Sequence, residues 1–216
     1  MFKQKKNIDK KVRIRTHKEL EIRKYEFLKI CNLLDKLEIR YFLQGGVLLG
    51  ALRHNGFIPW DWDAELSVFS SEVSEKMDLL IKEISASGFL IEFYSRELST
   101  LKIDFVGELK GDVTQYTIMG WNHNKKEKIF WRKKYKIPDH FLINMKKIKL
   151  FDKYHFAQYP PEKYLEYQYG DWKIPLQTSD KYKYMRREYS GLNIFNDTLI
   201  KIVKKFVFFI KKLIFK

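Results

Sequence analysis

The segment from Asp61 to Val68 constrains the fold of this chain most, because its polar and apolar residues alternate. Asp61, Asp63 and Glu65 occupy every second position, and apolar side chains stand between and after them: Trp62, Ala64, Leu66 and Val68. Side chains of a strand alternate between its two faces, so the pattern predicts three carboxylates on one face and a core on the other. Three such carboxylates repel one another, and a divalent cation with oxygen ligands is the simplest compensation. The alternative is an edge strand whose acidic side chains are solvated.

A pair of glycines precedes this strand. Residues 41–43 are expected to form a short strand, Gly45 and Gly46 a turn, and residues 47–53 a helix. The backbone N–H groups of such a turn and the N-terminus of the following helix favour an anion. Gly45 and Gly46 are therefore candidate phosphate-binding residues, and the alternative is a tight turn without a ligand.

Four more residues are candidates for the same site. Arg53 and His54 end the predicted helix, where they either contact phosphate oxygens or lie on the surface. Asp104 stands in the middle of an apolar run, which is unusual unless its carboxylate faces a site; a solvated edge strand is again the alternative. Trp172 either stacks on a base or sugar or packs in the core, and the short helix before it favours the core.

Hydrophobic periodicity predicts an α+β fold with a mixed sheet flanked by helices. Further helices and strands are expected as follows: helices over residues 17–37, 71–86 and 161–169, and strands over residues 89–95, 100–107 and 112–119. Residues 122–153 are basic and poorly periodic, which indicates loops with short elements.

The two ends of the chain carry most of its charge. With 42 Lys and Arg against 27 Asp and Glu, the formal net charge is +15. Residues 1–24 carry +7 and residues 199–216 carry +6, so residues 25–198 carry only +2. We therefore divide the chain into a basic N-terminal segment, a nearly neutral catalytic domain over residues 25–198, and a basic C-terminal segment.

The C-terminal segment predicts an amphipathic helix. Residues 199–216 read LIKIVKKFVFFIKKLIFK, in which the six Lys fall on one helical face and every other residue is Leu, Ile, Val or Phe. Such a helix is typical of the interface of an anionic membrane. Its longest apolar run has five residues, too short to span a bilayer. Packing against the domain or against a partner is the alternative.

Cysteine usage and the first residues indicate the compartment. Cys31 is the only cysteine and cannot form an internal disulfide, and the basic N-terminus lacks the apolar stretch of a secretory signal. We expect a cytoplasmic protein bound peripherally to the inner face of the plasma membrane. A non-catalytic membrane or nucleic-acid binder is an alternative function, but no recognisable DNA- or RNA-binding motif accompanies the basic ends, so nucleic acid is not expected as a partner.

Residues 46–63 read GVLLGALRHNGFIPWDWD, and residues 160–175 form a second motif later in the chain. The first is similar to the pattern G-T-L-L-G-x-x-R-x-x-x-h-I-P-W-D-x-D-h-D of the LicD family, which includes bacterial phosphocholine transferases and fukutin-related ribitol-phosphate transferases. Residues 160–175 resemble the closing element P-x(3–4)-Y-L-x(3)-Y-G-x-W-x-x-P. The resemblance extends over residues 41–175. It departs from the pattern at Val47, where the family has Thr, and at Glu65, where the family has Asp.

The resemblance implies a nucleotidyltransferase-like fold and a phosphotransferase that depends on Mg²⁺ or Mn²⁺. A phospho-alcohol such as phosphocholine would pass from a CDP-linked donor to a hydroxyl of a free or lipid-linked glycan, as in modification of lipopolysaccharide, capsule or teichoic acid. Gly46 would cradle phosphate. Asp61, Asp63 and Glu65 occupy the acidic triplet, and either Asp61 with Asp63 or Asp63 with Glu65 binds the metal. Asp104 occupies the position of the later catalytic acid and is the expected general base. The alternative enzyme is a nucleotidyltransferase that adds NMP to a small molecule.

Overall fold

The computed structural model describes residues 12–109, 114–178 and 180–186. Its elements in chain order are α1 (His17–Lys36), β1 (Tyr41–Leu43), α2 (Gly45–His54), β2 (Asp63–Phe69), α3 (Ser70–Val73), α4 (Met77–Ala86), β3 (Leu90–Ser95), the 3₁₀ turn η2 (Leu98–Thr100), β4 (Lys102–Val106), β5 (Gln115–Asn124), β6 (Ile129–Arg132), β7 (Tyr135–Pro138), α5 (His140–Ile143), β8 (Lys146–Leu150), β9 (Lys153–Ala157), α6 (Pro161–Tyr169) and α7 (Lys181–Tyr184). The helix expected over residues 199–216 lies outside the described residues.

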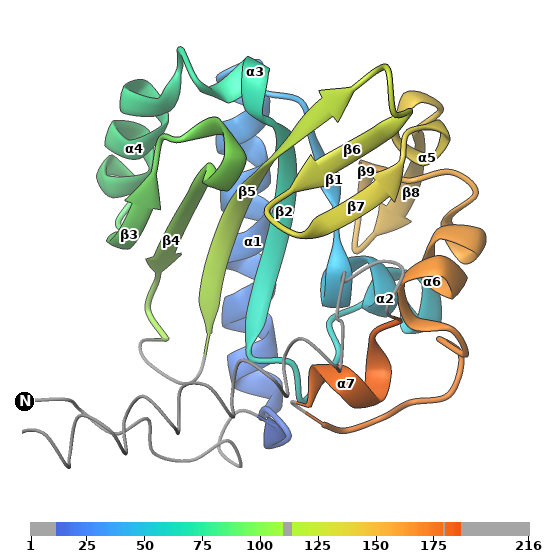
Figure 1. The fold of residues 1–216 in the computed structure, drawn as a ribbon. Coiled ribbons are helices and arrows are strands. Elements are labelled where there is room, and N and C mark those ends of the chain that lie inside the picture. Colours follow the sequence, from blue (N-terminus) through green and yellow to red (C-terminus); the bar gives the residue numbers. More distant parts are fainter. Residues whose placement is uncertain (1–11, 110–113, 179, 187–216) are drawn as a thin grey trace, which may run out of the picture.

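A mixed sheet forms the centre of the fold, with the strand order β3-β4-β5-β2-β1-β9-β8. The pairs β2–β5 and β1–β9 are parallel, and the other pairs along this path are antiparallel. The hairpin of β6 and β7 continues from β5 and crosses in front of the sheet in Figure 1, where α1 runs behind it. The predicted α+β fold with a mixed sheet and flanking helices is confirmed.

The alternation predicted for β2 separates a core face from a polar face. Ala64, Leu66 and Val68 are at most 2% exposed and belong to the main hydrophobic cluster. Their face of the sheet packs on α1. Tyr116, which pairs with Ala64 and shares its face, donates a hydrogen bond from its hydroxyl to a carboxylate oxygen of Glu26 on α1 at 2.7 Å. The opposite face of β2 therefore remains available for polar side chains.

On that polar face the strand register places candidate residues in rows. Glu65 on β2 pairs with Thr117 on β5, and Thr117 pairs with Asp104 on β4. One step further along the sheet, Ser67 pairs with Met119, and Met119 pairs with Lys102. Paired residues of neighbouring strands point to the same side of a sheet, so both rows face the same region of space.

Several expected boundaries change in the structure. β2 begins at Asp63 rather than Asp61, because the N–H of Asp61 closes a turn on the carbonyl of Ile58 at 3.0 Å. The helix expected over residues 71–86 is divided into α3 and α4, since a tight turn follows α3. The basic region over residues 122–153 forms short paired strands, β6 to β8, that are joined to their neighbours in hairpins.

The N-terminal part of the described chain packs on the body of the protein. Thr16 and Glu19 form a reciprocal capping box at the start of α1. α1 continues across the expected division between residues 24 and 25, and the backbone N–H of Arg15 donates to the carbonyl of Pro59 at 2.7 Å. In the part of the chain that the structure covers, no helix has the length and apolarity needed to cross a membrane.

Candidate active site

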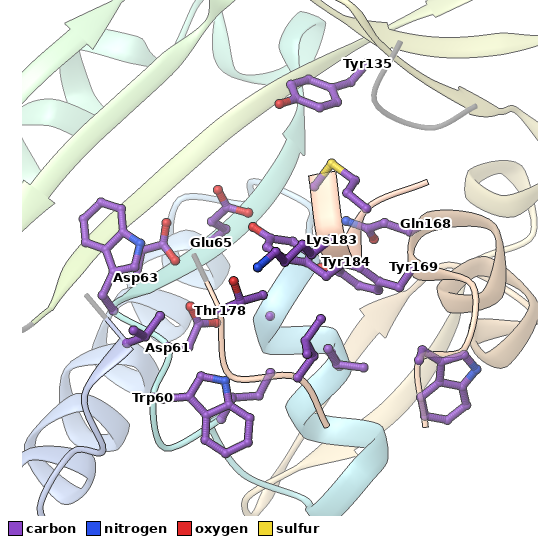
Figure 2. A pocket seen from close by; sticks show the side chains of 18 of the residues that line it. Trp60, Asp61, Asp63, Glu65, Tyr135, Gln168, Tyr169, Thr178, Lys183 and Tyr184 are labelled. Carbon is purple, nitrogen blue, oxygen red and sulfur yellow. The ribbon is translucent and has the colours of Figure 1, made fainter. Parts of the chain in front are cut away.

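β2 and the turn before it place three carboxylates at the wall of one cavity. Asp61, Asp63 and Glu65 all line this space, which has a volume of about 1110 Å³. Asp63 and Glu65 share a face because they are two residues apart on a strand, and the turn at Ile58 brings Asp61 beside them. Figure 2 shows the three carboxylates on one side of the cavity. The structure thus brings together the acids that the alternation predicted to be neighbours.

Asp61 and Asp63 interact directly. Burial raises the pKa of Asp61 well above its ordinary value, and the negative charge of Asp63 and a hydrogen bond between the two side chains raise it further. The charge of Glu65 adds to the same effect. Two carboxylates in contact cannot both remain charged without compensation, so this pair is suited to bind a proton or a cation.

A buried arginine on α1 fixes the backbone of this pair. The guanidinium of Arg23 donates to the carbonyl oxygen of Asp61 at 2.6 Å and to that of Asp63, and the residue is only 1% exposed. Its guanidinium carbon lies 4.7 Å from the centre of the Phe57 ring. A guanidinium is a planar fork of donors, so it holds two carbonyls in a defined geometry. Arg23 therefore fixes the backbone from which the two carboxylates project.

The two glycines lie directly against the carboxylates, and the structure places both in the first turn of α2 rather than in a separate turn before the helix. Gly45 and Gly46 begin α2, and Gly45 has a φ of +58°, which glycine adopts without strain. A Cβ atom on Gly46 would stand 1.8 Å from Oδ2 of Asp61, and one on Gly45 would stand 2.8 Å from Oε2 of Glu65. Only glycine lets the helix N-terminus approach the acids so closely, and the unpaired N–H groups at such a terminus favour an anion.

The cavity combines these acids with cations and aromatic rings from later parts of the chain. Its cationic lining residues are Arg53, Lys102, Arg132, Lys133, Lys134 and Lys183. Its aromatic lining residues are Trp60, Trp62, Trp121, Tyr135, Tyr169, Trp172 and Tyr184. A ligand with several negative groups and a flat base would find partners of both kinds here.

The other predicted phosphate contacts have different positions. Arg53 lines the cavity, but its guanidinium donates to the carbonyl oxygens of Trp172 and Ile174, which fixes that segment beside α2. His54 lies outside the set of described lining residues, with its Nε2 atom 3.0 Å from the carbonyl oxygen of Phe57. Trp172 is half-buried, lines the cavity and also packs against the core. Its two alternative roles are therefore compatible.

Asp104 lies on the same face of the sheet as the triplet, two strands away from Glu65. It is 7% exposed and does not belong to the described residues that line the cavity. The hydroxyl of Thr117 donates to its Oδ1 atom at 2.7 Å, and the ammonium of Lys102 lies 2.5 Å from Oδ2. Both carboxylate oxygens are therefore engaged within the protein.

The donor set at Asp61 and Asp63 fits a small oxygen-binding cation. Among the residues described, no group of three His, Cys, Asp or Glu side chains is arranged to hold a metal ion. Two carboxylates are enough for Mg²⁺, which is usually bound by one or two protein carboxylates together with substrate phosphates. The contact between Asp61 and Asp63, and the direction of Glu65 toward Gly45, favour the first of the two pairings that the sequence left open.

Sequence reasoning missed three residues of this site. Arg23 shares the apolar face of α1 with Phe27, and a charged residue on such a face is a signal that could have identified it. Lys102 lines the cavity two residues before Asp104. Burial and then the charges of the three acids raise the pKa of the Tyr184 hydroxyl, which keeps it a neutral hydrogen-bond donor near them. Nothing in the short-range sequence pattern indicated Tyr184.

Comparison with known proteins points to one family. A family model described as LicD/FKTN/FKRP, nucleotidyltransferase domain, matches residues 38–157, more than half of the chain. The lipopolysaccharide cholinephosphotransferase LicD of Haemophilus influenzae is 41% identical over 51 residues, which are 24% of this chain and 19% of that protein.

Two human relatives match as well. The ribitol 5-phosphate transferase FKRP is 43% identical over 44 residues, which are 20% of this chain and 9% of that protein. The ribitol-5-phosphate transferase FKTN is 29% identical over 153 residues, which are 68% of this chain and 32% of that protein. This chain thus matches less than a third of the length of each of these three relatives. The extent of the family match shows that the chain belongs to the LicD/FKTN/FKRP family of nucleotidyltransferase domains.

Proposed function

We propose that this protein transfers a phospho-alcohol from a CDP-linked donor to a hydroxyl group of a glycan, with Mg²⁺ or Mn²⁺ as its cofactor. The observation that carries this proposal is the contact of two carboxylates, Asp61 and Asp63, beside the two glycines at the start of α2. The names of the relatives support the class of reaction, because they include a cholinephosphotransferase and two ribitol-phosphate transferases.

The residues of the site have separate tasks in this reaction. Asp61 and Asp63 would hold the divalent cation, and Arg23 holds the backbone of both in place. When bound, the cation neutralises charge on the donor phosphates. The N–H groups at Gly45 and Gly46 bind phosphate oxygens at the same point. Phosphoryl transfer requires mainly such positioning and charge neutralisation, so a rigid arrangement of this kind supplies most of what the reaction needs.

We also propose that residues 199–216 attach the enzyme to the inner face of an anionic membrane, where lipid-linked glycans could serve as acceptors. The support is the sequence alone, with six Lys on one side of a predicted helix and apolar residues on the other. Truncation before Asn196 should abolish sedimentation with vesicles that contain anionic lipid. If the truncated and full chains sediment equally, the attachment lies elsewhere.

The function is tested by the mass of the product. The wild-type protein is incubated with Mg²⁺, a glycan acceptor, and CDP-choline, CDP-ethanolamine, CDP-glycerol or CDP-ribitol in turn. The proposal predicts an acceptor that gains one phospho-alcohol and the release of CMP. An acceptor that gains a nucleotide instead would show that the protein is a nucleotidyltransferase acting on the acceptor, and this outcome would overturn the proposal.

A further inference from the structure

Exposed apolar side chains stand where the active-site cavity opens to solvent. Ile174 and Leu176 line the cavity although they are 64% and 48% exposed, and Ile14 is 64% exposed two residues after Val12, which also lines it. All three exposed side chains lie outside the helices and strands. Aliphatic side chains that gather at the rim of a cavity and remain in water mark a surface that binds something apolar.

Hydrogen bonds hold in place the two segments that carry these side chains. The side-chain amide of Gln177 donates to the carbonyl oxygen of Val12 at 2.5 Å, which joins the segments to each other. The guanidinium of Arg53 on α2 donates to the carbonyl oxygen of Ile174 at 3.0 Å. Figure 1 shows the start of α1 and the chain between α6 and α7 at the same lower end of the molecule. The three aliphatic side chains therefore share one end of the protein.

The segments that continue from this end are basic. The described chain begins at Val12 and ends at Arg186, and both Val12 and Met185 line the cavity. Residues 1–11 contain five Lys and one Asp, and residues 187–216 contain six Lys and one Arg against two acids. The sequence therefore attaches charges of +4 and +5 to the part of the molecule at which the cavity opens.

This charge decides between the surfaces that could cover the aliphatic side chains. A second copy of the chain would bring an equally basic end, so two copies would repel each other here. An anionic lipid bilayer attracts cations to its surface and takes up aliphatic side chains between its headgroups. Lys173, which is exposed next to Ile174, adds a cation within the same segment. The charge and the apolar side chains therefore both fit an anionic membrane.

We propose that Ile14, Ile174 and Leu176 insert into the headgroup region of an anionic membrane, so that the mouth of the cavity faces the bilayer. This inference goes beyond the proposed function, because it concerns the orientation of the folded domain and does not depend on the reaction. It also differs from the attachment proposed for residues 199–216, which alone would leave the domain free to turn. With the mouth at the bilayer, a substrate attached to lipid would enter the cavity from the membrane surface.

The test places a fluorophore at single positions of the full chain. Nitrobenzoxadiazole, whose emission increases in an apolar environment, is attached to the new thiol of Ile174→Cys or Ile143→Cys. Cys31 does not compete for the label, because it is fully buried and burial raises the pKa of its thiol to about 12. Ile143 is the matched control, since it is 59% exposed on α5, outside the described cavity lining and far from the lower end in Figure 1. Each protein is mixed with vesicles of phosphatidylcholine, with or without phosphatidylglycerol.

We expect anionic vesicles to increase the emission at position 174 and to shift it to shorter wavelength. Neutral vesicles should have little effect, and the label at position 143 should not respond to either kind. In sedimentation assays, the unlabelled triple variant Ile14→Ser, Ile174→Ser, Leu176→Ser should partition onto anionic vesicles about tenfold more weakly or less, since burial of each aliphatic side chain favours partition by at least that factor. Ile143→Ser should partition like the wild type.

Other results would overturn the inference. If the labels at positions 174 and 143 respond equally, or neither responds, the mouth of the cavity does not face the bilayer, even where the full chain sediments with vesicles through residues 199–216. An equal response to neutral vesicles would contradict the role of charge. An increase with protein concentration in the absence of vesicles would show that the surface binds a second copy. Failure of the proposed function would appear separately, as absence of phospho-alcohol in the product.

Discussion

The substitution Gly46→Ala tests whether the approach of α2 to the carboxylates matters for the site. The new Cβ atom would stand 1.8 Å from Oδ2 of Asp61, whereas ordinary contact begins at about 3.4 Å, so that oxygen must move by about 1.6 Å. A shift of about 1 Å in a reacting arrangement costs about a hundredfold in rate. We therefore expect Gly46→Ala to reduce transferase activity at least a hundredfold and to weaken Mn²⁺ binding.

The fold should survive this change. Gly46 lies in a helix without a positive φ, and alanine in place of a helical glycine favours the helix by up to about 1 kcal/mol. The matched control is Gly56→Ala, whose Cβ would meet its nearest neighbour, an atom of His54, at an ordinary 3.5 Å. Mn²⁺ affinity is measured from the electron paramagnetic resonance signal of the free ion, and stability from urea unfolding. If Gly46→Ala binds Mn²⁺ and turns over like Gly56→Ala, the position of the Asp61 carboxylate is not important and the reasoning is refuted.

Two further predictions concern buried groups. Arg23→Met should lower the free energy of unfolding by about 2 to 3 kcal/mol, because it removes two charge-assisted bonds to the carbonyls of Asp61 and Asp63, and it should also weaken Mn²⁺ binding. Urea unfolding and Mn²⁺ titration measure the two effects. Unchanged metal affinity would contradict the role of Arg23 in holding the backbone of the two aspartates. Burial, followed by the charge of Lys153, lowers the pKa of His155 to about 4, so the unfolded chain takes up a proton below pH 6.5 that the folded chain does not. The contribution of this histidine to the free energy of unfolding is fully present above pH 6.5 and falls by about 2 to 3 kcal/mol as the pH drops to 4. Urea unfolding at several pH values should show a shallower fall for His155→Gln than for the wild type. An equal fall would refute the dependence of stability on protonation of His155.

Local patterns predicted the elements that carry their own signal. The strict alternation after Pro59 identified β2 and its polar face, and the two glycines identified the start of α2. Proline at the first position, Glu162 in the first turn and Gly170 after the last residue gave the bounds of α6. These features depend on neighbouring residues only, so a single sequence contains enough information to find them.

The rest of the site depends on contacts between distant residues. Arg23 reaches the carbonyls of Asp61 and Asp63 across 38 and 40 positions of sequence, and no local pattern encodes that contact. The strands between residues 122 and 153 were obscure for a different reason. β8 is an edge strand of five residues, three of which are exposed Lys, so its hydrophobic signal is weak although it forms a hairpin with the adjacent β9.

Asp104 shows that the sequence can indicate an unusual residue without revealing its role. Its place inside an apolar strand correctly indicated an unusual environment, because it is buried on the polar face of the sheet. The sequence did not reveal that Thr117 and Lys102 engage both of its oxygens. The role of general base expected from the sequence therefore stays a prediction.

Metal-dependent release of CMP tests the central claim most directly. CDP-alcohol donors are incubated with acceptor and with increasing Mg²⁺ in the presence of the wild type, of Asp63→Asn or of Asp152→Asn, a control in the exposed turn between β8 and β9. Because Asp63 is proposed to bind the cation, we predict saturable, Mg²⁺-dependent release by the wild type and by Asp152→Asn, and almost none by folded Asp63→Asn. Normal Mg²⁺-dependent release by Asp63→Asn would contradict the account.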